Sequence, residues 1–199
     1  MSKPLKPLSK TFKSVQKPKQ ARLIITFECE RQCPGCCNHY KSIMQHAKKA
    51  ELKDLKDYEV VMLTGGEPML DWKHTLEIAK TLKAQNPQVK VYLYTAHHRF
   101  PSVLKTILEV VDGIQYSIHE NASYGDYLDF HDFQHVIQQY PNKSFRLYID
   151  PKGNDKPLAI CPNLWKRVEV KAWLTEEQLL ALQPNGLPQN EDLFILTNH

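Results

Sequence analysis

The sequence predicts an α/β fold in which parallel strands form an open, partial (β/α)6 barrel. Six short runs rich in β-branched and aromatic residues recur along the chain, at 22–28, 58–64, 90–96, 113–119, 144–150 and 167–173. Helix-like stretches separate most of these runs, which is the order expected of βαβ units in a parallel sheet. Six strands are fewer than the eight that close a full (β/α)8 barrel, so we expect the barrel to stay open.

Four stretches between or after these runs carry helix signals. Asp71 can cap a helix whose apolar residues share one face, and Asn86-Pro87 ends it. Pro101 suits a first helical turn, and apolar residues repeat at helical spacing from Phe130 to Tyr140. Thr175 to Gln178 form a capping box at the start of a final helix.

The chain of 199 residues fits one main domain with distinct ends. We expect a basic, flexible extension at 1–20, the partial barrel at 21–174, and a C-terminal helix and tail at 175–199. Residues 1–22 contain seven lysines and arginines and no acid, so the total charge of +4 leaves −3 for the remainder. Such a segment could contact RNA, DNA or an acidic partner, but charge runs are more often solvated, and we favour a solvated extension.

Composition and the absence of long apolar runs point to a soluble globular protein. Apolar residues make up 42% of the chain, and no run reaches the length of a membrane span. The basic N-terminus lacks the apolar core of a secretory signal, so we expect a cytoplasmic protein without a membrane partner.

The chain has five cysteines, four of them within the nine residues from Cys29 to Cys37, while Cys161 stands alone. In a chain expected to remain in the cytoplasm, a tight cluster of this kind indicates metal binding or catalysis rather than disulfides. We interpret Cys37 as a packing or adventitious thiol and Cys161 as a structural one, the alternatives for Cys161 being an auxiliary cluster or a hydrogen donor.

The first predicted strand leads into the spacing C-x3-C-x2-C, formed by Cys29, Cys33 and Cys36. A 4Fe–4S cluster usually takes four cysteines, so three would leave one iron open to bind something else. The rival interpretation is structural zinc, which usually takes four ligands in two separated pairs. Cys37 and His39 could supply a fourth ligand, but they crowd the same loop.

The second predicted strand ends in Gly65, Gly66, Glu67 and Pro68. Glycines at a strand end let the backbone approach a ligand closely, and a neighbouring carboxylate can accept from an ammonium group. This tetrapeptide follows the cysteine loop by one predicted βα unit, at the end of the sheet where such folds place their chemistry.

The two motifs together resemble the radical S-adenosylmethionine (radical SAM) superfamily. The resemblance implies that Cys29, Cys33 and Cys36 ligate a 4Fe–4S cluster whose fourth iron is chelated by S-adenosylmethionine. It implies that the Gly65–Pro68 segment holds the methionine part of that cofactor. The resulting activity would be reductive cleavage of S-adenosylmethionine to methionine and a 5′-deoxyadenosyl radical, which abstracts hydrogen from a substrate. An external one-electron donor is then required.

Other strand ends supply weaker candidates. The resemblance implies that Ser117 contacts the ribose of the cofactor, and Thr95 at the end of the third strand could line the same cavity, as could Tyr94. Asp150 and Lys171 are candidate substrate contacts at the fifth and sixth strands.

Within the superfamily, Cys-Pro-Gly-Cys followed by Asn38 resembles the small activating enzymes of anaerobic ribonucleotide reductases. Gly35 departs from the many members with an aromatic residue before the third cysteine, and Cys37 departs from the activating enzymes. The compact layout is also similar to 7-carboxy-7-deazaguanine synthases. The first likeness implies a glycyl-radical enzyme as the substrate, which is the leading expectation, and the second implies a small molecule or nucleotide as the alternative. Outside the superfamily, the alternative is a zinc-bearing nucleic-acid-binding module.

Overall fold

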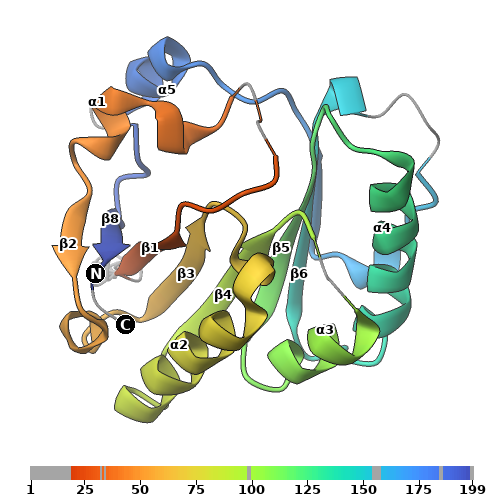
Figure 1. Cartoon of the computed structure of the whole chain (residues 1–199), viewed down its shortest axis with the longest axis horizontal. Helices are drawn as coiled ribbons and strands as arrows, with labels where there is room; N and C mark the ends of the chain where they lie inside the picture. The colour runs from red at the N-terminus through yellow and green to blue at the C-terminus, as the bar shows by residue number, and fades with distance from the viewer. Residues whose placement is uncertain are drawn as a thin grey trace, which may run out of the picture.

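A computed structural model describes residues 19–31, 33, 35–97, 100–153, 158–183 and 186–197. Its centre is one eight-stranded sheet with the order β2-β8-β1-β3-β4-β5-β6-β7, in which every pair of neighbours is parallel (Figure 1). The strands are β1 (Gln20–Thr26), β2 (Lys48–Ala50), β3 (Val60–Gly65), β4 (Lys90–Thr95), β5 (Gly113–Ile118), β6 (Ser144–Ile149), β7 (Arg167–Val170) and β8 (Glu191–Leu196).

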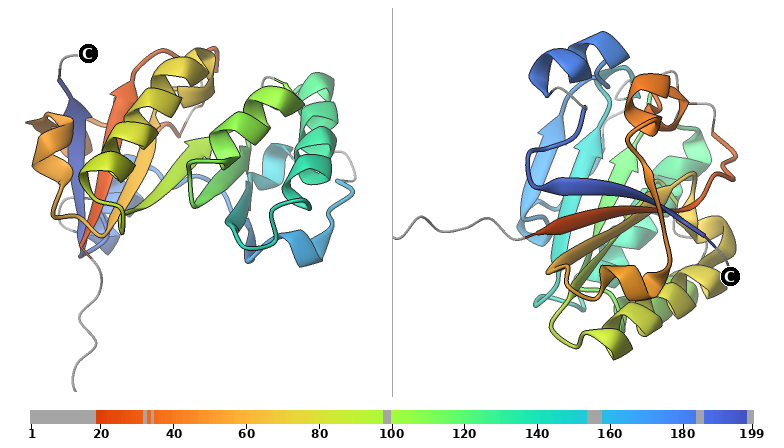
Figure 2. Two further views of the ribbon diagram at one scale, coloured as in Figure 1. Left: turned by 90° about the horizontal axis from the view of Figure 1, so that it is seen from below. Right: turned by 90° about the vertical axis from the view of Figure 1, so that its left-hand side faces the viewer.

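The prediction of an open, partial barrel of parallel strands is confirmed. All six predicted strands are present, with ends shifted by a few residues, and the edge strands β2 and β7 do not pair with each other in the described part of the chain. The sheet has two strands more than predicted. β2 is only three residues long, and β8 lies in the segment for which we predicted a helix and a tail. β8 is inserted between β2 and β1, as Figure 2 shows.

The helices are α1 (Lys41–Met44), α2 (Trp72–Gln85), α3 (Pro101–Leu108), α4 (Tyr124–Ile137) and α5 (Glu176–Leu182). The predicted caps are present: Asp71 accepts from the backbone N–H of His74, and Thr175 forms a capping box with Gln178. α4 begins earlier than its apolar repeat suggested, because Ser123 and Asp126 form a capping box ahead of that repeat. No helix in the described ranges is both long and apolar enough to cross a bilayer.

The two faces of the sheet differ in chemistry. On the outer face, α2, α3 and α4 cover fully buried apolar side chains, and the register aligns Leu23 with Leu63 and Leu63 with Leu93. The alternate residues point to the inner face of the curved sheet, where cavities lie, and include Arg22 and Tyr94. The core therefore lies between the sheet and the helices, while the inner face is left for ligands.

Candidate active site

The cysteine loop leaves the end of β1 and crosses the carboxyl ends of the strands. Cys29 is exposed, Cys33 and Cys36 are half-buried, and all three are free thiols. The backbone N–H of Cys36 donates to the carbonyl oxygen of Cys33 at 3.1 Å, and the Sγ of Cys29 accepts from the backbone N–H of Arg31 at 3.4 Å. These bonds fold the loop back on itself, so that its thiols line one side of a cavity.

Two side chains fasten this loop to the rest of the barrel. Asn38 donates from Nδ2 to the carbonyl oxygen of Gly65 at 2.5 Å. Arg31 forms an ion pair with Asp126 at the start of α4 and donates to the carbonyl oxygen of Ala96 at 3.3 Å. Burial opposes the charge of Arg31, but the hydrogen bond to Asp126 and the attraction to its negative charge together outweigh burial and raise the pKa of the guanidinium. The loop is thereby held by β3, β4 and α4 together.

The two glycines at the end of β3 allow a close approach between two backbones. The backbone N–H of Gly66 donates to the carbonyl oxygen of Thr26, and that of Glu67 donates to the carbonyl oxygen of Glu28, each at 2.7 Å. Gly65 has a φ of +127°, and a Cβ on Gly66 would lie 2.0 Å from the carbonyl oxygen of Glu28. We expected these glycines to let a ligand approach the backbone. In the structure, the group that leaves no room for side chains at these positions is the start of the cysteine loop.

Glu67 is a buried carboxylate that joins the ends of two strands. One of its oxygens accepts from the Thr95 hydroxyl at 2.5 Å and from the backbone N–H of Met69 at 3.0 Å. The other accepts from the backbone N–H of Ala96 at 2.9 Å. Burial raises the pKa of Glu67 although these hydrogen bonds favour its charged form. Two predicted site residues, Glu67 and Thr95, therefore contact each other and fix the rim of the cavity.

The cavity beside the cysteines has a volume of about 350 Å³ and is called here the cysteine cavity. Of the predicted site residues, it is lined by Cys29, Cys33, Cys36, Gly65, Gly66, Glu67, Thr95 and Ser117. Pro68 does not line it: this residue is buried, and its carbonyl oxygen accepts from the Thr75 hydroxyl at 2.7 Å. Tyr94 lines the cavity, whereas Asp150 and Lys171 line neighbouring cavities.

Sequence reasoning missed the role of Trp173 in this cavity. Its indole stacks on the ring of His119, with centroids 5.2 Å apart and planes 7° from parallel. A Cβ on Gly35 would lie 2.5 Å from the Cβ of Trp173, so the glycine makes room for the tryptophan. His119 in turn places Nδ1 3.4 Å from the Sγ of Cys33. The one available signal was Gly35, since its lack of a side chain suggests that another group packs there.

The thiols and the cavity fit an iron–sulfur cluster. Burial, followed by the negative charge of Cys36, raises the pKa of Cys33 to about 11, so the thiolate needs a nearby cation to form. Within the described residues, no three His, Cys, Asp or Glu side chains converge as ligands of one metal ion. A cluster does not require such convergence, because each cysteine binds a different iron atom. Three free thiols from one loop that line one cavity therefore fit such a cluster.

Comparison with protein families identifies the domain. A family model described as a 4Fe-4S single cluster domain matches residues 21–119, the segment that contains both the cysteine loop and Gly65–Pro68. This match indicates a 4Fe–4S cluster in that part of the chain. No curated protein matches this chain.

Two solved structures are similar to this chain. One is described as BtrN in complex with AdoMet and 2-DOIA, at 16% identity and a TM-score of 0.46, covering 79% of this chain and 57% of the other. The second is described as Streptococcus suis SuiB bound to S-adenosylmethionine, at 15% identity and a TM-score of 0.47, covering 91% of this chain and 48% of the other. This chain thus spans about half the length of these proteins.

Proposed function

We propose that this enzyme cleaves S-adenosylmethionine reductively and uses the resulting 5′-deoxyadenosyl radical to abstract hydrogen from a substrate. The observation that supports this proposal is the juxtaposition of Cys29, Cys33 and Cys36 with Gly65–Glu67 around one cavity at the carboxyl ends of the strands. We assign the three cysteines as cluster ligands. The cluster, when bound and reduced by an external donor, supplies the electron for cleavage of the sulfonium bond.

The residues of the chain contribute binding, orientation and exclusion of water. Arg31 and Asn38 hold the cysteine loop against the strand ends, and this contact fixes the distance between the thiols and Gly65. The stacked pair of His119 and Trp173 forms an aromatic wall of the cysteine cavity. An aromatic wall and a buried polar rim exclude water from a site where a reactive radical would be quenched.

The first prediction concerns the cluster ligands. Replacement of Cys33 by alanine should abolish both cluster binding and cofactor cleavage, because two thiols cannot hold the cluster in place. The test is anaerobic: reconstitute the protein with iron and sulfide, add dithionite and S-adenosylmethionine, and measure iron content and 5′-deoxyadenosine. Cys161→Ala is the control, since this exposed thiol does not line the cysteine cavity, and it should retain both properties. Full iron content and turnover in Cys33→Ala would show that the assignment is wrong.

Two kinds of substrate are compatible with this chemistry. The likeness of Cys33–Asn38 to activating enzymes favours a glycyl-radical enzyme, which should form a stable complex with this chain. A small-molecule substrate would instead need a pocket next to the cysteine cavity, and the inner face of the sheet provides one of about 410 Å³. We therefore propose a small molecule as the substrate, acted on in the cytoplasm. The basic segment that prompted a nucleic-acid partner lies almost entirely outside the described residues.

A further inference from the structure

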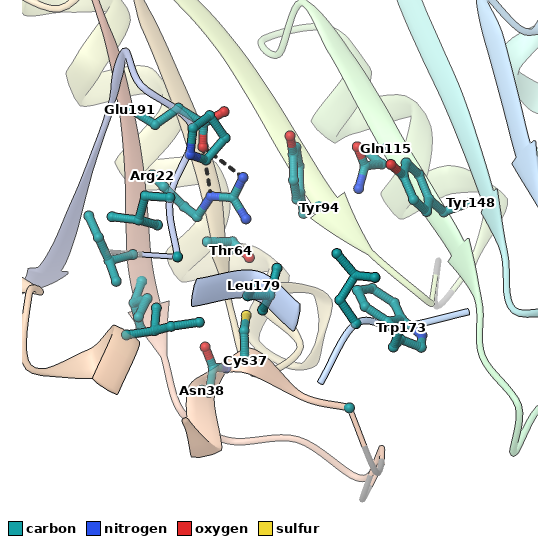
Figure 3. Close-up of a pocket in the computed structure, with 18 of the residues that line it drawn as sticks. Arg22, Cys37, Asn38, Thr64, Tyr94, Gln115, Tyr148, Trp173, Leu179 and Glu191 are labelled. Atoms are coloured by element: carbon teal, nitrogen blue, oxygen red, sulfur yellow. Dashed lines mark hydrogen bonds and ion pairs between the residues drawn. The ribbon is translucent and has the colours of Figure 1, made fainter. Parts of the chain in front are cut away.

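The inner face of the sheet forms a second cavity, called here the cationic pocket. It has a volume of about 410 Å³, which lies within the range of small-molecule sites. Its lining includes four cations and two aromatic rings: Arg22, Arg146, Arg167, Lys171, Tyr94 and Tyr148. Figure 3 shows Arg22 and Tyr94 on one side of this pocket and Trp173 on another. The cysteine cavity is grouped around the thiols, and Arg146, Arg167, Lys171 and Tyr148 do not line it.

The positive charge of the pocket is a local property. Residues 23–199 together carry a net charge of −3, yet Arg146, Arg167 and Lys171 from this part of the chain line the pocket. They lie on the adjacent strands β6 and β7 or directly after β7, with Arg146 opposite Arg167 in the register. Like charges placed opposite each other across a sheet are unfavourable without a counterion, so the arrangement favours a bound anion.

Two carboxylates offset only part of this charge. Arg22 donates to Glu191 from Nε at 3.2 Å and from Nη2 at 2.7 Å, which pairs this cation fully. Arg167 and Lys171 share one carboxylate, that of Glu169. Arg146 has no ion-pair partner among the described residues, and its side chain is exposed to the pocket. Glu191 is thus the one acid in the described lining, Glu169 pairs with two of the cations from outside it, and the guanidinium of Arg146 is left for a ligand.

Aromatic rings form much of the remaining wall. The Nζ of Lys171 lies 4.5 Å from the ring centroid of Tyr148, and the guanidinium of Arg22 lies 5.6 Å from that of Tyr94. The ring centroids of Trp173 and Tyr148 lie 6.5 Å apart. Trp173 lines this pocket as well as the cysteine cavity. A ligand here would have its apolar part against these rings and its charged group near the guanidinium of Arg146.

The cationic pocket is continuous with the cysteine cavity. Seven residues line both: Arg22, Cys37, Asn38, Thr64, Tyr94, Gln115 and Trp173. A molecule bound in the cationic pocket would thus lie next to the group that occupies the cysteine cavity. Transfer of a hydrogen atom requires this kind of proximity between the reacting centres.

We propose that the cationic pocket binds the substrate of this enzyme, and that this substrate is a small organic anion carrying a carboxylate or a phosphate. The inference rests on the proposed function, because it assigns the substrate side of the same active site. Arg146 is the residue that recognises the anionic group. Arg22 positions the wall between the two cavities through its paired contact with Glu191.

The test uses pairs of probes that share an aromatic part and differ in whether they carry an anionic group. Benzoate is compared with benzamide, and benzyl phosphate with benzyl alcohol, by calorimetric titration into the anaerobically reconstituted protein containing S-adenosylmethionine. At least one anion should bind roughly tenfold more tightly than its neutral partner, and the better pair identifies carboxylate or phosphate as the preferred group. Arg146→Gln should remove roughly tenfold of that affinity. This residue lines the cationic pocket and not the cysteine cavity, so its effect separates the two sites.

Lys105→Gln is the control, because this cation is exposed on α3, on the opposite face of the sheet, and it should leave the affinity unchanged. Equal affinity for charged and neutral probes would overturn the proposal, as would an Arg146→Gln variant that binds the anion as well as the wild type. A protein that binds the anion but forms no 5′-deoxyadenosine would instead contradict the proposed function. The two failures are therefore distinguishable.

Discussion

At Gly66, the neighbouring backbone of the cysteine loop, and not a ligand, leaves no room for a side chain. The end of β3 runs so close to Glu28 that a Cβ would lie 2.0 Å from its carbonyl oxygen and 2.6 Å from its carbonyl carbon. Both neighbours are backbone atoms, which cannot rotate away as a side chain could. The contact also joins the two predicted motifs, since it links Gly65–Pro68 to the start of the cysteine loop.

Gly66→Ala should therefore destabilise the protein by about 1–3 kcal/mol, the usual cost of overpacking. Each kcal/mol should lower the Tm by about 2–4 °C in a chain of this size. Thermal unfolding followed by circular dichroism measures this change. Gly125→Ala is the matched control: a Cβ there would meet only the Ser123 hydroxyl at 3.5 Å, an ordinary contact, so we expect no loss of stability. Equal Tm values for Gly66→Ala and the wild type would contradict the close approach.

At the scale of elements, Asp112 joins three segments of the outer layer. Asp112 lies just before β5 begins. Its carboxylate accepts from the Nζ of Lys83 on α2 at 2.5 Å and from the backbone N–H of Val91 on β4 at 2.8 Å. The Nζ of Lys90 lies 3.2 Å from its second oxygen. Burial opposes ionisation of Asp112, but these hydrogen bonds outweigh it and hold its pKa below the usual value.

This lowered pKa predicts a pH dependence of stability. A carboxylate whose pKa is lower in the folded state stabilises the protein above its unfolded pKa of about 3.9, and this contribution disappears as the pH falls through the folded pKa. Asp112→Asn should lower the free energy of unfolding by about 1–3 kcal/mol at pH 7, because the substitution weakens bonds to two cations and a backbone N–H. This difference in unfolding free energy between the variant and the wild type should shrink below about pH 4. Urea unfolding at both pH values measures it, with the exposed Asp57→Asn as control. A difference that stays constant with pH would contradict this role of the carboxylate.

At the scale of the whole molecule, β8 determines how the barrel is arranged. It pairs with β1 from Glu191 to Ile195 and with β2 over three residues, so β1 has a neighbour on both sides (Figure 2). Phe194 aligns with Leu23 and is buried with it in the main core. Glu191, at the start of the same strand, pairs with Arg22 beside the cationic pocket. The C-terminal segment thus contributes to the core and to the pocket at once.

An inner strand should be protected from solvent exchange. We expect the backbone amides of 192–196 to exchange with deuterium as slowly as those of β3, since both strands are paired on each side. Hydrogen exchange with mass spectrometry measures this protection, and the loop at 119–123 provides a rapidly exchanging reference. Complete exchange of 192–196 at the earliest time point would show that this segment is a tail and not a strand.

Much of the fold was predictable because its signals are local. The alternation of β-rich runs and capped helices determined the fold class, and Asp71 and Thr175 cap their helices as predicted. The spacing of Cys29, Cys33 and Cys36 and the tetrapeptide from Gly65 to Pro68 indicated the radical SAM superfamily. Each of these signals lies within a few residues of sequence, where residue type and spacing alone limit the possible structure.

Only the tertiary structure decided how distant segments meet. Arg22 and Glu191 are separated by 169 positions, and Glu67 and Thr95 by 28, so no local pattern predicts these contacts. β8 begins with two acids and gave no clear strand signal, and its place in the sheet depends on pairing with β1. The cationic pocket likewise exists because parallel register brings one residue from each of several strands to the same inner face. The sequence by itself therefore determined which chemical groups this chain carries, and the long-range pairing of strands decided which of them line the same cavity.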